Sequence, residues 1–245
     1  MNYKKPILTE ILIKLVFEKG SLRESEIFDI VPKAKASGLT LVEIGQGMEI
    51  GQPIKNDEPK EGLKEGFIVP KIRCWNPEKT LLLQLMPDTI IANQVGEYLG
   101  WDELKKFFHT NLDFAKDAIQ NTNYKSVLLQ TIDNFSVNRE GFSLGQYLNC
   151  GGNKVPAWYQ NSNESADITL GRGFLEEDMK NRQIRIGIRK QKESFSVRID
   201  SIFHNKLNTK RDLNEVLEEL HIESNESFES VITDKVRNEI MGGVI

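Results

Sequence analysis

Arginines alternate with isoleucines in residues 183–189, and arginines spaced in this way on a β-strand could bind an anion or an acidic surface. Side chains two apart in a strand point to the same side, so Arg185 and Arg189 share one side and the isoleucines share the other. Residues 195–200 repeat this pattern and add Arg198. Guanidinium groups form paired hydrogen bonds with carboxylates and phosphates. The predicted binding surface therefore consists of Arg73 from an earlier strand, Arg185, Arg189 and Arg198.

Two aromatic side chains, Trp158 and Tyr159, lie within the polar residues 149–165 and extend the predicted binding surface. Tryptophan and tyrosine are enriched among the residues that anchor protein interfaces. A loop folded back onto the protein would bury them equally well. The arginines also have a second interpretation, because an antiparallel sheet often keeps one face in water and charged side chains suit that face.

The histidines suggest a different chemistry, which is general acid–base catalysis or metal binding. His109 and His221 occupy similar places in two predicted helices, so a hydrolase or nuclease that uses His109 and His221 is one alternative. Neither histidine lies in a metal-ligand spacing such as HExxH, and His221 follows Leu217 and Leu220, which is typical of a buried structural histidine. The sequence also has no nucleophile elbow and no phosphate-binding loop. We therefore predict no catalytic, cofactor-binding or metal-binding residue, and we expect a protein that is not an enzyme.

Two long amphipathic helices are predicted to cover the strands that carry these residues. Residues 211–241 place apolar side chains at steps of three and four, which forms one broad apolar stripe. Residues 101–119 show the same stripe. Helices of this kind bury their stripes by packing on a sheet.

The order of predicted elements divides the chain into two tandem halves, residues 1–122 and residues 123–245, each β-α-β-β-β-α. The strands are predicted at 7–18, 41–50, 67–75 and 80–92 in the first half and at 124–137, 166–178, 182–190 and 194–204 in the second. The shared order indicates an internal duplication. We expect one α+β unit, an antiparallel sheet with the two long helices on one face. Helix-grip and TATA-binding-protein-like folds have an analogous order of elements.

Composition limits the classes of protein that remain. The chain has 245 residues, with 32 lysines and arginines against 36 aspartates and glutamates, and a formal net charge of -4. This mild acidity argues against a general nucleic-acid coat but allows a local basic face. Two cysteines give no disulfide framework, and no run of about 18 apolar residues could span a membrane. We expect a cytoplasmic protein with no membrane partner.

Three segments carry a family resemblance, namely the N-terminal PILTEILIKLVFE, residues 82–108 and residues 219–242. The residues that fit its motifs are Gln84, Pro87, Asn93, Tyr98, Gly100, Trp101, His221, Phe228, Ile232, Thr233, Asp234 and Arg237. Over its whole length the chain resembles a family of sporadically distributed bacterial proteins of uncharacterised function. Where that family has an Arg-Ile-Gly-Leu-Arg-Tyr-like strand, residues 126–131 of this chain read SVLLQT. The resemblance implies no activity or cofactor, and a patchy distribution is similar to that of genes in defence or mobile loci.

The sequence therefore favours a non-enzymatic binding or regulatory protein whose partner is another protein. The resemblance adds that it would be an accessory component of a bacterial antiviral defence or mobile-element locus. A nucleic-acid-binding module that uses the same arginines is the first alternative. The hydrolase or nuclease that uses His109 and His221 is the second.

Overall fold

The computed structural model describes residues 3–18, 24–49, 67–116, 123–140, 142–149, 165–172, 180–207 and 211–244. Its strands are β1 (Leu8–Phe17), β2 (Leu41–Glu49), β3 (Phe67–Trp75), β4 (Leu81–Met86), β5 (Thr89–Val95), β6 (Tyr124–Asn138), β7 (Ala166–Arg172), β8 (Lys180–Lys190) and β9 (Ser194–Lys206). Its helices are α1 (Glu24–Ala36), α2 (Trp101–Lys116), α3 (Leu144–Tyr147) and α5 (Leu213–Val231), followed by the short π-helix η2 (Val236–Ile240).

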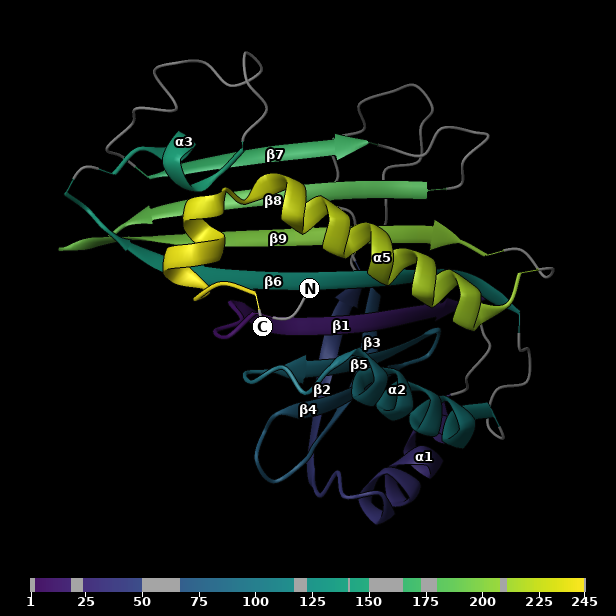
Figure 1. Cartoon of the computed structure of the whole chain (residues 1–245). Helices are drawn as coiled ribbons and strands as arrows, with labels where there is room; N and C mark the ends of the chain where they lie inside the picture. The colour runs from purple at the N-terminus through teal and green to yellow at the C-terminus, as the bar shows by residue number, and fades with distance from the viewer. Residues whose placement is uncertain are drawn as a thin grey trace, which may run out of the picture.

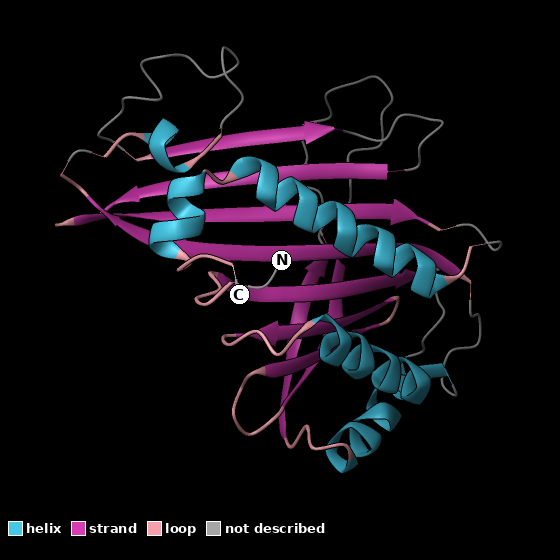
Figure 2. Cartoon of the chain, viewed as in Figure 1, coloured by secondary structure: helices cyan, strands magenta, loops and turns pink. Residues whose placement is uncertain are grey.

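The described strands form one antiparallel sheet in the order β2-β3-β4-β5-β1-β6-β9-β8-β7 (Figure 1). β1 and β6 lie side by side near its centre, where Leu12 is paired with Gln130. Figure 2 shows the long helices gathered on one side of the strands. The predicted α+β class with a large antiparallel sheet is confirmed. None of the described helices is both long enough and apolar enough to cross a membrane.

Alternation along the strands decides which side of the sheet the helices cover. In β1, Ile11, Ile13 and Leu15 are buried, whereas the residues between them are only half-buried. The buried side chains join residues of α1, α2 and α5 in one apolar cluster, so these helices share the helix side of the sheet. We call the other side, which carries Lys14 and Arg185, the open side. None of the described helices packs on it (Figure 1).

The core on the helix side consists of two apolar clusters. The first lies under α1, α2 and the first half of α5, and it includes Phe17 and Phe203. The second lies under the end of α5, and it includes Phe195 and Ile232. α5 therefore spans both clusters as it crosses β6, β9 and β8 (Figure 1).

α5 is shorter than the helix predicted for residues 211–241. The carboxylate of Asp212 caps its start by accepting hydrogen bonds from backbone N–H groups of the first turn. The helix ends at Val231 because Ile232 is extended and pairs with Leu148. The backbone N–H of Thr233 then donates to the carbonyl of Tyr147. A pairing partner distant in sequence thus overrides the helical pattern.

The strand predicted at residues 80–92 is two strands, β4 and β5, which pair across a turn at Pro87 and Asp88. The prediction is wrong here because apolar residues on both sides hide a turn sequence that favours chain reversal. Residues 1–122 therefore contain β2, β3, β4 and β5 after α1, and the β-α-β-β-β-α order is wrong for this half. In residues 123–245 the described elements follow as β6, α3, β7, β8, β9 and α5.

The start of α2 fixes one contact between the two long helices. Gly100 has a φ of 108°, in the region that favours glycine, and α2 begins at the next residue. The ring of Trp101 stacks on His221 of α5, with centroids 4.3 Å apart. Its Nε1–H donates to the carboxylate of Glu218 at 3.1 Å. Trp101 therefore joins α2 to α5.

Candidate functional site

Arg185, Arg189 and Arg198 lie on the open side of β8 and β9. These strands pair along their whole length, which places the guanidinium groups at neighbouring positions. They line a hollow of about 580 Å³. Ile186 and Ile188 of the same strand are buried on the helix side. The structure thus brings together these arginines of the predicted binding surface.

Two of these arginines have acidic neighbours. An Nη2 of Arg189 lies 2.9 Å from a carboxylate oxygen of Asp167, and an Nη2 of Arg198 lies 3.9 Å from one of Asp200. The arginine side chains are 58% and 51% exposed. Ion pairs this exposed contribute only about 0 to 1 kcal/mol to stability. A partner could therefore exchange these pairs for its own at little cost.

Arg185 differs from the other two because no described carboxylate pairs with it. Its Nη2 donates to the amide oxygen of Gln183 at 3.1 Å. Asp200, which lies opposite Arg185 in the strand register, accepts instead from Nε2 of Gln130 at 2.8 Å. The hollow therefore carries a positive charge, that of Arg185, which the described residues do not neutralise.

The remaining residues of the predicted surface do not join this hollow. Arg73 lies on β3 with its Nη1 3.8 Å from Glu43, and β4, β5, β1, β6 and β9 separate β3 from β8. At a strand spacing of about 4.8 Å this places Arg73 roughly 29 Å away along the sheet. Trp158 and Tyr159 lie outside the described residues.

A band of basic side chains crosses the middle of the open side, with Lys14 of β1 at its centre. Burial lowers the pKa of Lys71, and the charges of Arg73 and Lys14 lower it further. On the other flank, burial lowers the pKa of His204 to about 4, and Lys14 again contributes. The charge of Lys14 therefore acts on groups to either side of it on the open side.

The structure does not bring together the histidine pair of the hydrolase alternative. His221 stacks on Trp101, its Nε2 lies 3.1 Å from Nδ2 of Asn225, and burial lowers its pKa, so the ring is neutral at pH 7. His109 lies about two turns beyond Trp101, or about 12 Å along α2. Within the described ranges, no group of His, Cys, Asp and Glu side chains could hold a metal ion.

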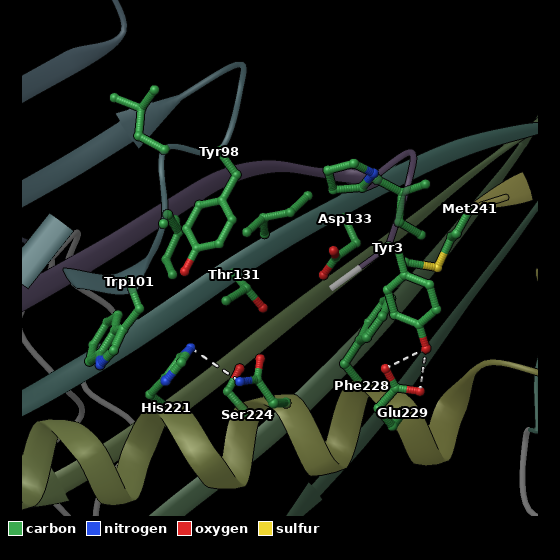
Figure 3. A pocket seen from close by; sticks show the side chains of 17 residues that line it. Tyr3, Tyr98, Trp101, Thr131, Asp133, His221, Ser224, Phe228, Glu229 and Met241 are labelled. Atoms are coloured by element: carbon green, nitrogen blue, oxygen red, sulfur yellow. Dashed lines mark hydrogen bonds between the residues drawn. The ribbon is translucent and has the colours of Figure 1, made fainter. Parts of the chain in front are cut away.

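A second cavity, of about 510 Å³, lies on the helix side between β1, β6 and α5 (Figure 3). It was not predicted from the sequence. A signal for it exists, because the row of β6 side chains that faces α5 contains two polar members among apolar ones. That row reads Val127, Leu129, Thr131, Asp133, Phe135 and Val137.

Comparison of the chain with models of protein families and with curated proteins gives no match. The family resemblance therefore stays an interpretation of the sequence motifs.

Proposed function

We propose that this protein is a binding protein, and that the hollow around Arg185, Arg189 and Arg198 captures an acidic region of another protein. The observation that supports this most directly is the gathering of these guanidinium groups on neighbouring strands. Each can form paired, directional hydrogen bonds with a carboxylate. The strands that carry them are packed on the helix side, so little backbone freedom is lost on binding.

A protein partner fits this hollow better than a nucleic acid because the hollow has charges of both signs. Asp167 and Asp200 line it beside the arginines. A nucleic acid gains affinity mainly by phosphate neutralisation, which needs cations without acidic neighbours. A protein surface presents both signs, so its carboxylates can meet Arg185 while its basic groups meet the aspartates.

Nucleic acid is the second candidate, and the basic band around Lys14 favours it. The pKa of Lys71 and that of His204 are both lowered by burial and by the charge of Lys14. This band runs across the centre of the open side of the sheet, on which none of the described helices packs (Figure 1). Phosphates laid along it would meet successive cations, and the affinity would fall steeply with added salt.

Exchange of Arg185, Arg189 and Arg198 for glutamine tests the proposal. We expect the wild-type protein to capture one protein reproducibly from a lysate of its own host at about 150 mM salt, and the triple variant to lose it. The captured protein is identified by mass spectrometry. It is then purified, and its affinity for both forms is measured by calorimetry, where we expect a Kd at least tenfold higher for the variant, roughly the loss of one charged hydrogen bond.

A matched control removes positive charge outside the hollow, by changing the exposed Lys5, Lys35 and Lys106 to glutamine. This control should capture the partner as the wild type does. Equal capture by the arginine variant, or no direct binding of the purified partner, would contradict the proposal. Binding to DNA or RNA with a Kd that rises at least tenfold between about 50 and 200 mM salt would select the second candidate.

We also propose that residues 1–122 and 123–245 are tandem halves of one structural unit, of the helix-grip or TATA-binding-protein-like kind. The pairing of β1 with β6, the first strand of each segment, supports this. The long helices α2 and α5, which follow the last strand of each segment and share the helix side, support it as well. A cytoplasmic location is part of the same proposal. The link to an antiviral defence or mobile-element locus stays a prediction.

A further inference from the structure

The cavity on the helix side lies where the two apolar clusters of the core meet. In β6, the row that faces α5 passes from Leu129 of the first cluster to Phe135 of the second through Thr131 and Asp133. On α5, the buried Ser224 likewise stands between members of the two clusters. The polar residues of both elements therefore meet in one gap of about 510 Å³, a size typical of sites for small molecules.

Several polar groups around this gap have no hydrogen-bond partner among the described residues. They are the carboxylate of Asp133 and the hydroxyls of Tyr98, Thr131 and Ser224. Figure 3 shows Tyr98 and Thr131 turned toward the same space, with Asp133 next along β6 and Ser224 on α5. Each of these groups can accept a hydrogen bond from a molecule in the cavity. Their convergence on one space therefore indicates a site that is built to hold a polar ligand.

Asp133 is the most unusual of these groups. Its side chain is only 5% exposed, and burial raises its pKa to about 7. An unpaired carboxylate in a protein core lowers stability, and an apolar residue at this position of β6 would avoid that loss. A destabilising carboxylate on the wall of a cavity is characteristic of a functional site.

The charges around the cavity favour a cationic ligand. Asp133 can only accept hydrogen bonds when ionised, and the hydroxyls of Tyr98 and Thr131 can accept as well. Among the described residues, no lysine or arginine lines the cavity, and His221 is neutral because burial lowers its pKa. An anion would meet Asp133 without a compensating cation. An ammonium group offers three donors to these acceptors.

Aromatic and apolar side chains form much of the remaining wall, beside the polar Asn225 and Glu229. Tyr3, Tyr98 and Phe228 line the cavity together with Met241, as Figure 3 shows. Aromatic rings attract cations through their faces, and these side chains also offer apolar area to the body of a ligand. The wall thus suits a molecule with a charged end and an apolar end.

We propose that this cavity binds a small organic cation, a primary ammonium on an apolar or aromatic body, with the ammonium held by Asp133, Thr131 and Tyr98. The body packs against Phe228 and Met241. The site lies on the opposite side of the sheet from the arginine hollow. Binding of the cation can therefore be tested independently of the proposed protein partner.

Calorimetry with three related probes tests this site at about pH 8, where Asp133 is ionised because its pKa is about 7. The probes are phenethylammonium, the neutral 2-phenylethanol and the anionic phenylacetate. We expect only phenethylammonium to bind with a Kd below about 1 mM. Asp133→Asn, which removes the charge but keeps the shape, should raise that Kd roughly tenfold or more.

Two further variants separate binding from folding. Asp29→Asn removes an exposed carboxylate of α1, away from both cavities, and should leave the Kd for phenethylammonium unchanged. Thr131→Val keeps the shape of the cavity and removes one acceptor, so it should weaken binding less than Asp133→Asn does. Equal binding of 2-phenylethanol, an unchanged Kd in Asp133→Asn, or no binding of phenethylammonium at concentrations up to about 10 mM would overturn the proposal.

Discussion

Replacing Trp101 with alanine is expected to lower the free energy of unfolding by about 3 to 5 kcal/mol, the range for removal of a large buried aromatic side chain. The indole is 9% exposed and contributes to the first apolar cluster. Its stacking on His221 and its hydrogen bond to Glu218 join α2 to α5. Alanine removes both contacts and leaves a cavity between the helices. Urea unfolding followed by circular dichroism measures the change.

Two further variants serve as controls for the loss of stability expected in Trp101→Ala. Ile222→Ala, on α5 next to His221 and 54% exposed, should change the free energy of unfolding by less than about 0.5 kcal/mol. Trp101→Phe keeps a ring but loses the N–H that Glu218 accepts, so an intermediate loss is expected. A loss in Trp101→Ala no larger than that in Ile222→Ala would contradict the role of Trp101 as the contact between the helices.

Asp133→Asn is expected to make the protein more stable than the wild type, by as much as about 4 kcal/mol at pH 8. Burial raises the pKa of Asp133 from 3.8 to about 7, so the folded protein keeps a proton that the unfolded chain releases in this interval. The wild type therefore loses stability relative to the variant as the pH rises from about 4 to about 7, at about 1.4 kcal/mol for each pH unit. Below this interval the two proteins should have similar stability.

Two histidines change the stability of the wild type with pH in the direction opposite to Asp133. Burial lowers the pKa of His204 to about 4 and also lowers that of His221, so both contribute stability that is lost as the pH falls below about 6.5. Tyr3 and Tyr98, which also line the cavity, keep their protons over this range because burial raises their pKa. Glu229 accepts a hydrogen bond from Tyr3 and one from Arg237. The free energy of unfolding of the wild type should therefore change less with pH than it would with Asp133 alone or with the histidines alone.

Urea unfolding of both proteins between about pH 4.5 and 8 separates these contributions, because the difference between wild type and Asp133→Asn cancels the histidines. His204→Gln should steepen the fall of wild-type stability toward high pH, since it removes an opposing group. A difference between wild type and Asp133→Asn that is the same at every pH would show that burial does not hold a proton on this carboxylate.

The alternation of apolar and polar residues along a strand made it possible to predict which side chains share a side of the sheet, because this period of two is a local property of the chain. Arg185 and Arg189 lie opposite the isoleucines of β8 for this reason, and the α+β class followed from strands with long amphipathic helices. The end of α5 was not predictable in this way. It depends on the pairing of Ile232 with Leu148, which no local pattern contains.

The neighbours across the sheet also depend on strand order, which the sequence leaves open. Arg73 lies on the open side, as expected, but it belongs to β3, which is far from β8 in the sheet. The cavity on the helix side was missed because its walls come from the N-terminal residues, the segment before α2, β6 and α5. Thr131 and Asp133, two polar residues within the apolar row of β6, were its visible sign in the sequence. The position of Asp133 in the fold could not be predicted without knowing that β1 pairs with β6.

The central position of β1 affects how the chain can fold while it is being synthesised. β1 is made early, yet one of its neighbours, β6, follows more than a hundred residues later, as the pairing of Leu12 with Gln130 shows. Contacts so distant along the chain slow folding. Until β6 leaves the ribosome, one edge of β1 stays without that partner, and exposed strand edges promote aggregation. Chaperones that shelter nascent chains should therefore raise the yield of this protein more than they raise that of a helical protein of similar length.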